Sequence, residues 1–210
     1  MIKGVIFDFH GTLAFKSKSV DVQKLCEFLR KDGYDVYHQE WTAAYKFVFF
    51  VEYPKGKIKS YEDYFKRVFG LLGIKPTVAA VKKVANYFRE NERFELYPDV
   101  ESVRKLGVKK AVLTTTPDFK FGYLDLAGFD PVMTGKEIGK AKPHPNGFLK
   151  ILKIWKMKPS EVLMVGDEAD LDIIPAKLLG IKTAFVGREN QVCGEADYNI
   201  SSLKGLLKII

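Results

Sequence analysis

Short apolar runs alternate with amphipathic segments over the second half of the chain. The apolar runs predict buried strands at residues 111–113, 131–134, 162–165 and 183–186. Apolar residues at helical spacing predict helices at residues 98–106, 118–127, 145–155, 171–179 and 203–209. Strands that alternate with helices predict an α/β fold with a doubly wound, Rossmann-like parallel sheet. Ligands of such sheets bind at the carboxyl ends of the strands.

Between residues 15 and 94 the apolar positions follow helical spacing throughout, and no strand is predicted. Breaks at residues 32–33, 54–56 and 73–76 divide this stretch into four helices. An isolated apolar run, Val5 to Phe7, precedes it, and a single strand must join the later sheet to be buried. The sequence therefore predicts a core of residues 1–14 and 97–210, with residues 15–96 inserted as a helical cap.

The composition favours a folded protein. Hydrophobic residues make up 47% of the 210 residues, which is enough to bury a substantial core. No run of 18 apolar residues predicts a membrane span, and the start of the chain lacks the features of a signal peptide. The two cysteines, Cys26 and Cys193, lack metal-ligand spacing, so we expect free thiols in the cytoplasm.

The net charge of +8 arises from 34 basic and 26 acidic residues. The lysines are scattered among acids at helical spacing, as on solvated helix faces. We therefore expect no nucleic-acid partner, although a basic surface would attract a small phosphorylated substrate. The sequence carries no indication of oligomeric state.

Polar residues stand at the ends of three predicted strands. Asp8 follows the first strand, Thr114 ends the second, and Asp167 follows the strand at 162–165. The carboxyl ends of parallel strands meet at one edge of the sheet, so these side chains should lie close together. Neighbouring carboxylates repel each other unless a cation lies between them, and oxygen ligands suit Mg²⁺.

Four motifs occur in order along the chain. They are DFHGTL at 8–13, AVLTT ending at Thr115, KAKPHP with Lys142, and GDEADLD with Asp167 and Asp172. In their order and spacing these motifs resemble the haloacid dehalogenase superfamily, most of whose members are phosphatases. The helical insertion between the first two motifs matches the place of that family's cap domain.

The resemblance implies a metal site. Asp8 would be the nucleophile that forms an aspartyl-phosphate, and it would also bind Mg²⁺. The backbone carbonyl of His10 and the carboxylate of Asp167 would be further ligands. Asp172 would act through a bound water or orient Lys142, although Glu168 or Asp170 stands close enough in sequence to take that role.

The resemblance also implies a site for the substrate phosphate. Lys142 would neutralise Asp8 and the charge of the transferred phosphoryl group. Thr114 would offer its hydroxyl to the phosphoryl oxygens, together with Thr12 and Thr115. Thr115 stands where the family often has asparagine.

His10 departs from the family pattern. Phosphatases of the family have a second aspartate at this position, which acts as acid and base. Histidine can do this work, so His10 is a working acid/base, the mark of a slow or inactive relative, or an introduced substitution. Dehalogenases of the family have tyrosine there and need no metal, and phosphonatases have a small residue.

We therefore predict Mg²⁺-dependent hydrolysis of small phosphate monoesters through Asp8. Two alternatives stay open. One is a weak or inactive relative that binds Mg²⁺ and a phosphorylated metabolite, and the other is a phosphoacceptor domain. Aromatic residues of the cap could line the substrate pocket or belong to its core, namely Trp41, Tyr45, Phe49 and Tyr53.

Overall fold

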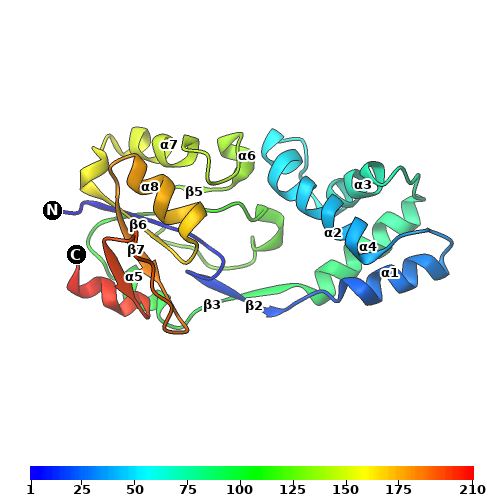
Figure 1. Ribbon diagram of the computed structural model, residues 1–210, viewed down its shortest axis with the longest axis horizontal. Helices are drawn as coiled ribbons and strands as arrows, with labels where there is room; N and C mark the ends of the chain where they lie inside the picture. Colours follow the sequence, from blue (N-terminus) through cyan, green and yellow to red (C-terminus); the bar gives the residue numbers. More distant parts are fainter.

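The computed structural model describes all of residues 1–210 as two lobes that lie side by side (Figure 1). The strands are β1 Gly4–Phe7, β2 Ala14–Lys18, β3 Arg93–Leu96, β4 Lys109–Leu113, β5 Val132–Met133, β6 Val162–Gly166, β7 Lys182–Val186 and β8 Tyr198–Ile200. The α-helices are α1 Val22–Lys31, α2 His38–Phe47, α3 Tyr61–Leu71, α4 Val78–Asn91, α5 Val100–Arg104, α6 Gly135–Ile138, α7 Asn146–Trp155 and α8 Ile174–Leu178.

The first lobe is built on a six-stranded sheet in the order β5-β4-β1-β6-β7-β8. All neighbouring strands are parallel, so the predicted doubly wound α/β sheet is confirmed. In the register of the sheet, Phe7 lies opposite both Val112 and Val165. The carboxyl ends of β1, β4 and β6 therefore meet at one level. The edge strand β8 was not predicted, because its three residues include no fully buried side chain.

Strand β1 is buried along its whole length because helices cover both faces of the sheet. Val5 and Phe7 pack on one face with apolar residues of α5 and of the C-terminal 3₁₀ helix, Leu203–Lys208. Ile6 packs on the opposite face with apolar residues of α7 and α8. This two-sided burial explains why the strand is a continuous apolar run.

The second lobe contains α1 to α4 and has its own hydrophobic core of 18 buried residues. Side chains cap the first turns of three of these helices: Asp21 accepts from Lys24 N, Ser60 from Asp63 N, and Thr77 from Ala80 N. Helix α2 continues into a π-helical turn, Val48–Glu52, which carries the chain toward the first lobe.

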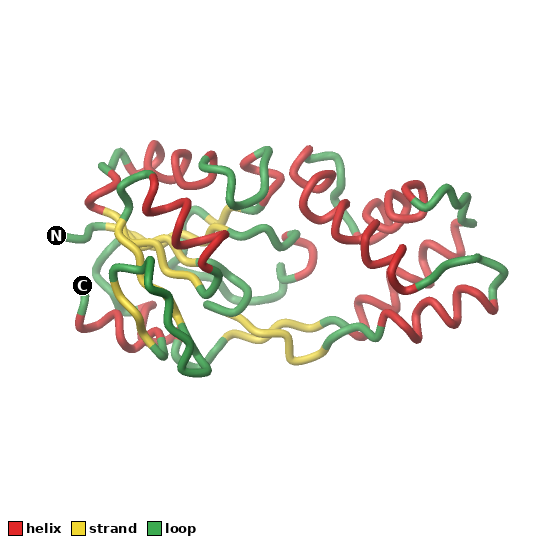
Figure 2. The backbone as a smooth tube through the Cα atoms, in the orientation of Figure 1, coloured by secondary structure: helices red, strands yellow, loops and turns green.

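A two-stranded antiparallel ribbon, β2 with β3, joins the lobes (Figure 2). The prediction that residues 15–94 contain no strand was therefore wrong at both ends. Only Ala14 of β2 is fully buried, so the ribbon lacks the apolar pattern of a sheet strand. Its partner strand lies more than 70 residues away along the chain, which local periodicity cannot detect.

Other predicted elements differ in extent. The helix predicted at residues 118–127 was wrong, since only a single 3₁₀ turn, Asp118–Lys120, forms there. The Lys120 side chain is drawn into the second lobe, and the Asp125 side chain accepts from Ala127 N in a local turn. Residues 171–179 form a π-helical turn followed by the short α8, and residues 203–208 form a 3₁₀ helix.

None of the helices has both the length and the apolar character needed to cross a lipid bilayer.

Candidate active site

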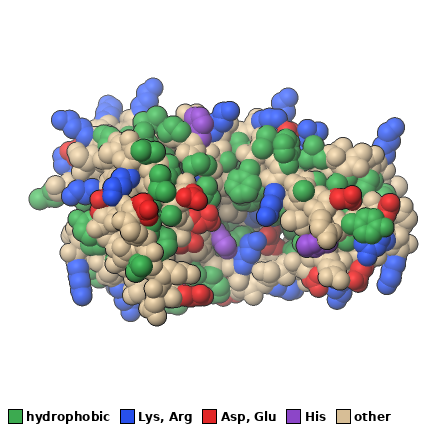
Figure 3. Space-filling view, in the orientation of Figure 1, with side chains coloured by type: hydrophobic (Ala, Val, Ile, Leu, Met, Phe, Trp, Pro, Cys, Tyr) green, Lys and Arg blue, Asp and Glu red, His purple; other side chains and the backbone are tan.

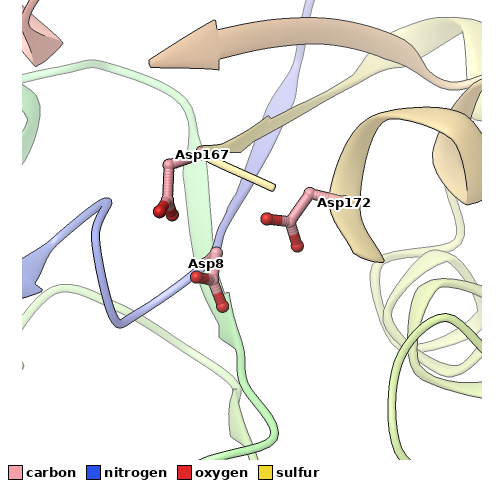
Figure 4. Close-up of side chains that lie close together, drawn as sticks. All are labelled: Asp8, Asp167 and Asp172. Atoms are coloured by element: carbon pink, nitrogen blue, oxygen red, sulfur yellow. The ribbon is translucent and has the colours of Figure 1, made fainter. Parts of the chain in front are cut away.

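Three carboxylates converge at the carboxyl edge of the sheet (Figure 4). Asp8 follows β1, Asp167 follows β6, and Asp172 lies in the π-helical turn after β6. Each contributes an oxygen atom to a group in which all such atoms lie within 4.8 Å of one another. Asp172 is fully buried, whereas Glu168 and Asp170 are exposed. The structure thus brings together the three aspartates that the sequence singled out.

Burial and mutual repulsion disfavour the charged form of these groups. Burial, with a smaller contribution from the charge of Asp8, raises the pKa of Asp167 to about 6. Burial also raises the pKa of Asp172, against the opposing effect of Lys142. The cluster therefore gains from any cation that enters it.

Lys142 provides one such positive charge from the segment before α7. Its buried Nζ contacts Asp8 Oδ1 and lies 2.6 Å from Asp172 Oδ1. Burial alone lowers the pKa of this ammonium, but the two carboxylates outweigh that effect and the net pKa is raised. When all three carboxylates are ionised, one lysine leaves two negative charges uncompensated, which suits a divalent cation.

Glycine is required in the turn after Asp8. Gly11 has φ +84°, and a Cβ there would lie 1.9 Å from Asp167 Oδ2. Thr12 Oγ1 donates to Asp167 Oδ1 at 2.9 Å, so this threonine positions a carboxylate and does not line the cavity beside Asp8. Its predicted contact with substrate phosphate has no support in this geometry.

Arg188, which the sequence did not single out, stabilises the turn after Asp8 through hydrogen bonds to its backbone. Its Nε donates to Gly11 O at 3.1 Å, and its Nη2 donates to Thr12 O at 2.5 Å. The guanidinium also pairs with Asp99 and lies 3.4 Å from the Tyr97 ring centroid. No motif marks this residue, because its partners are backbone carbonyls more than 170 positions away.

Threonine hydroxyls lie beside Asp8 at the end of β4. Thr114 Oγ1 accepts from Thr116 N at 3.0 Å, so its own proton is free to be donated. The Thr115 hydroxyl is buried and makes no hydrogen bond in the structure. A buried polar atom without a partner costs free energy, and an oxygen of a bound anion would satisfy it.

A cavity of about 110 Å³ opens on these groups. Its walls include Asp8, His10, Lys142 and the three threonines 114–116, and the π-helical turn of the second lobe closes it with Phe49 and Phe50. Of the aromatic residues suggested for the pocket, Phe49 lines this cavity and Tyr45 an adjoining one. Trp41 and Tyr53 are fully buried and belong to the helical core.

His10 lines the cavity, with its ring edge-on to Phe94 at 5.8 Å between centroids. Desolvation and the nearby charge of Lys16 lower the pKa of His10 below its ordinary value, against smaller opposing effects of Asp8 and Glu92. The ring is accordingly neutral near pH 7, a state that accepts a proton more readily than it donates one.

The donor set fits Mg²⁺. It consists of carboxylate oxygens in a site with excess negative charge, and it lacks cysteine and imidazole ligands of the kind that softer metals favour. Gly11 and Gly166 keep the space around the carboxylates open, because a Cβ at Gly166 would lie 2.3 Å from Asp172 Oδ2.

Known proteins of similar sequence are phosphatases. A glyceraldehyde 3-phosphate phosphatase of Methanocaldococcus jannaschii is 28% identical over 227 residues, covering 100% of this chain and 97% of that enzyme. A phosphoserine phosphatase of Thermus thermophilus is 35% identical over 111 residues, or 49% of this chain and 45% of the enzyme. A pyrophosphatase of Bacillus cereus is 34% identical over 131 residues, which cover 57% of this chain and 60% of that enzyme. The match thus spans less than two thirds of the latter two enzymes.

Solved structures share the fold over the whole chain. A 2-haloacid dehalogenase of Pseudomonas syringae superposes with a TM-score of 0.72 at 18% identity, covering 100% of this chain and 98% of that one. A HAD phosphatase of Thermococcus onnurineus superposes with a TM-score of 0.63 at 25% identity, covering 99% and 97%.

The family model of haloacid dehalogenase-like hydrolases matches residues 2–180, which include all four motifs and the helical lobe. This chain therefore belongs to the haloacid dehalogenase-like hydrolases.

Proposed function

We propose that the protein hydrolyses small phosphate monoesters, with Asp8 as the nucleophile. The observation that carries this proposal is the cavity beside Asp8. It presents a buried ammonium, Lys142, and a buried hydroxyl without a partner, Thr115, next to a carboxylate. Such a cavity suits a phosphoryl group at the point where the carboxylate can attack it.

The proposed reaction has two steps. A carboxylate oxygen of Asp8 attacks phosphorus, the bond from phosphorus to the ester oxygen breaks, and that oxygen takes up a proton to leave as an alcohol. Water then attacks the phosphorus of the aspartyl-phosphate and gives up a proton, which releases inorganic phosphate and restores the Asp8 carboxylate.

Each neighbouring group would stabilise the charge of the phosphoryl oxygens. Lys142 would supply positive charge on one side, held in place by Asp172. Thr114 and Thr115 would donate hydrogen bonds from their hydroxyls. Phe49 and Phe50 would keep bulk water away from the reacting atoms.

Mg²⁺ would be held by Asp8, Asp167 and the backbone carbonyl of His10, with Asp172 acting through water or through Lys142. When bound, the ion supplies positive charge that offsets the carboxylates and the phosphoryl oxygens. The excess negative charge of the cluster supports this assignment.

His10 would transfer the protons of both steps in place of the usual aspartate. A neutral imidazole suits the second step, in which a base takes a proton from water. It suits the first step less well, because an acid must protonate the leaving oxygen. We therefore propose that the enzyme works best on esters whose leaving groups need no protonation.

We further propose that residues 15–96 act as a cap that covers the substrate, as the position of Phe49 and Phe50 supports. The enzyme would work in the cytoplasm, where Cys26 and Cys193, both free thiols here, stay reduced.

The test is phosphate release from an aryl phosphate, with Mg²⁺ and with a chelator. Asp8→Asn serves as the control, because it keeps the shape of the side chain and removes the nucleophile. The proposal expects turnover that needs the metal and is lost in the variant. If the folded protein binds Mg²⁺ and phosphate without turnover, it is a binding protein. If it becomes phosphorylated on Asp8 and the phosphoryl group is not released, it is a phosphoacceptor. Either outcome would overturn the proposal.

A further inference from the structure

A second cavity, of about 190 Å³, lies next to the cavity beside Asp8. The two cavities share four wall residues, namely His10, Phe49, Phe50 and Thr116. The two cavities therefore adjoin, with these four residues at their common border. If the phosphoryl group lies at Asp8, the second cavity is a neighbouring space into which the leaving group of the substrate can extend.

The part of the second cavity beyond the shared residues is basic. We name it the cap subsite, and it consists of Lys16, Tyr45, Lys46, Glu92, Phe94 and Lys120. Three lysines face a single glutamate, which leaves a surplus of two positive charges. In the space-filling view, basic side chains and a histidine gather along the junction of the two lobes (Figure 3).

The three lysines differ in what already binds them. Lys120 is buried and satisfied, with its Nζ 2.5 Å from Glu92 Oε2 and 2.5 Å from the Tyr45 hydroxyl. Lys16 is partly satisfied, 3.2 Å from Glu92 Oε1 and 5.7 Å from the Phe94 ring centroid. Lys46 makes no ion pair and no hydrogen bond, although it lines the cavity. Lys46, helped by Lys16, is thus the charge available to a ligand.

We propose that the cap subsite binds a second anionic group on the substrate, a carboxylate or a second phosphate, carried by the leaving group. This inference rests on the proposed function of Asp8. The two cavities, of about 110 and 190 Å³, suit a leaving group of small size.

The experiment compares two esters of similar size. Phosphoglycolate carries a carboxylate in its leaving group, and 2-hydroxyethyl phosphate carries a neutral hydroxyl there. We expect kcat/KM to be higher for phosphoglycolate, and Lys46→Met to reduce the ratio of the two values by about three- to fivefold. Lys46→Arg should keep most of the preference. Inorganic pyrophosphate, assayed in parallel, shows whether a phosphate serves the subsite as well as a carboxylate does.

A matched control separates the subsite from the general charge of the surface. Lys82→Met removes an exposed, unpaired lysine from α4 of the same lobe, away from the cavity. It should leave the substrate ratio within about twofold of the parent protein. Equal losses from Lys46→Met and Lys82→Met, or no preference for the charged ester in the parent, would overturn the inference.

Failure of the proposed function gives a different result from failure of this inference. In that case neither the charged nor the neutral phosphate ester would be hydrolysed. The inference is then judged by binding, with Asp8→Asn protein titrated with each ester by calorimetry in the presence of Mg²⁺. Tighter binding of phosphoglycolate that is lost with Lys46→Met supports the subsite, and equal binding of the two esters rejects it.

Discussion

At the scale of single residues, the site combines charged groups whose burial would be unfavourable if each stood alone. Three carboxylates share one edge of the sheet, and a single buried lysine contacts two of them. An unpaired buried charge is more costly than a paired one, so each member depends on the others. The arrangement is therefore better explained by chemistry than by stability.

Replacing Lys142 with methionine should expose this dependence. The variant leaves Asp8 and Asp172 buried without their counter-ion, which should lower the free energy of unfolding by about 3–5 kcal/mol without metal. Urea denaturation in chelator measures the loss. Lys140→Met removes an exposed neighbouring lysine and should change stability by less than about 0.5 kcal/mol. Similar stability of the two variants would contradict the charge balance described here.

Introducing aspartate at position 10 should change which phosphate esters the enzyme hydrolyses fastest. His10→Asp supplies the acid that the leaving oxygen of an alkyl phosphate requires, whereas an aryl leaving group departs without it. We expect kcat to rise by about tenfold or more on an alkyl phosphate, and by much less on an aryl phosphate. An equal change on both substrates, or a loss on the alkyl ester, would show that His10 is not the group that handles this proton.

At the scale of elements, the turn after β1 is the most constrained part of the site. Gly11 needs a positive φ and leaves room for Asp167, and Arg188 holds the turn through two carbonyls. The conformation of this turn therefore decides whether the carboxylates of Asp8 and Asp167 lie close enough to share a metal.

Gly11→Ala should disturb this turn directly. The left-handed conformation costs a non-glycine residue about 1–2 kcal/mol, and the added methyl group would push Asp167 away. Stability should fall by at least that amount in thermal unfolding, and Mg²⁺-dependent activity should fall further. Gly107→Ala is the control, because a Cβ there meets nothing within 4 Å and its φ is unexceptional. Full activity in Gly11→Ala would show that the turn tolerates a shift of Asp167.

The central strands were predictable because a strand that is buried on both faces requires a continuous run of apolar residues. β1, β4 and β6, with Asp8, Thr114 and Asp167 at their ends, followed from this pattern, whereas Asp172 and Lys142 followed only from the family resemblance. The β2–β3 ribbon did not, since its pairing is distant and its surface is mostly exposed. Lys16 and Lys46 were equally hidden, because nothing local distinguishes them from the other lysines.

At the scale of the whole molecule, the cavity beside Asp8 and its neighbour lie where the two lobes meet. The ribbon joins the lobes on one side, and polar contacts reach across elsewhere. Lys120 of the first lobe pairs with Glu92 and contacts the Tyr45 hydroxyl, and the Tyr53 hydroxyl lies 2.7 Å from Thr134 Oγ1. In the proposed function, the first lobe would supply the reacting groups and the helical lobe would cover them.

Metal binding should stabilise the whole protein in a way that depends on pH. The pKa of Asp167 is raised in the folded state from 3.8 to about 6, so the native state binds more protons than the unfolded chain between these values. Without metal, stability should therefore fall as the pH rises through this window, by up to ~3 kcal/mol before solvent screening reduces it. The raised pKa of Asp172 extends the loss to higher pH.

Because Mg²⁺ binds the deprotonated carboxylates, it should restore the stability that is lost. The gain in Tm on adding Mg²⁺ should be larger at pH 8 than at pH 5. Asp167→Asn should reduce both the pH-dependent loss and the gain from metal. A gain in Tm that is the same at both pH values would argue against a carboxylate metal site.

The most direct measurement of the central claim is the covalent state of Asp8 during turnover. The protein is mixed with an aryl phosphate and Mg²⁺, quenched in acid within the first turnover, and digested for mass spectrometry. A phosphoryl group on the peptide that contains Asp8, absent with chelator and decaying as free phosphate appears, is the predicted result. Turnover with no phosphorylated Asp8, or turnover that persists in Asp8→Asn, would contradict it.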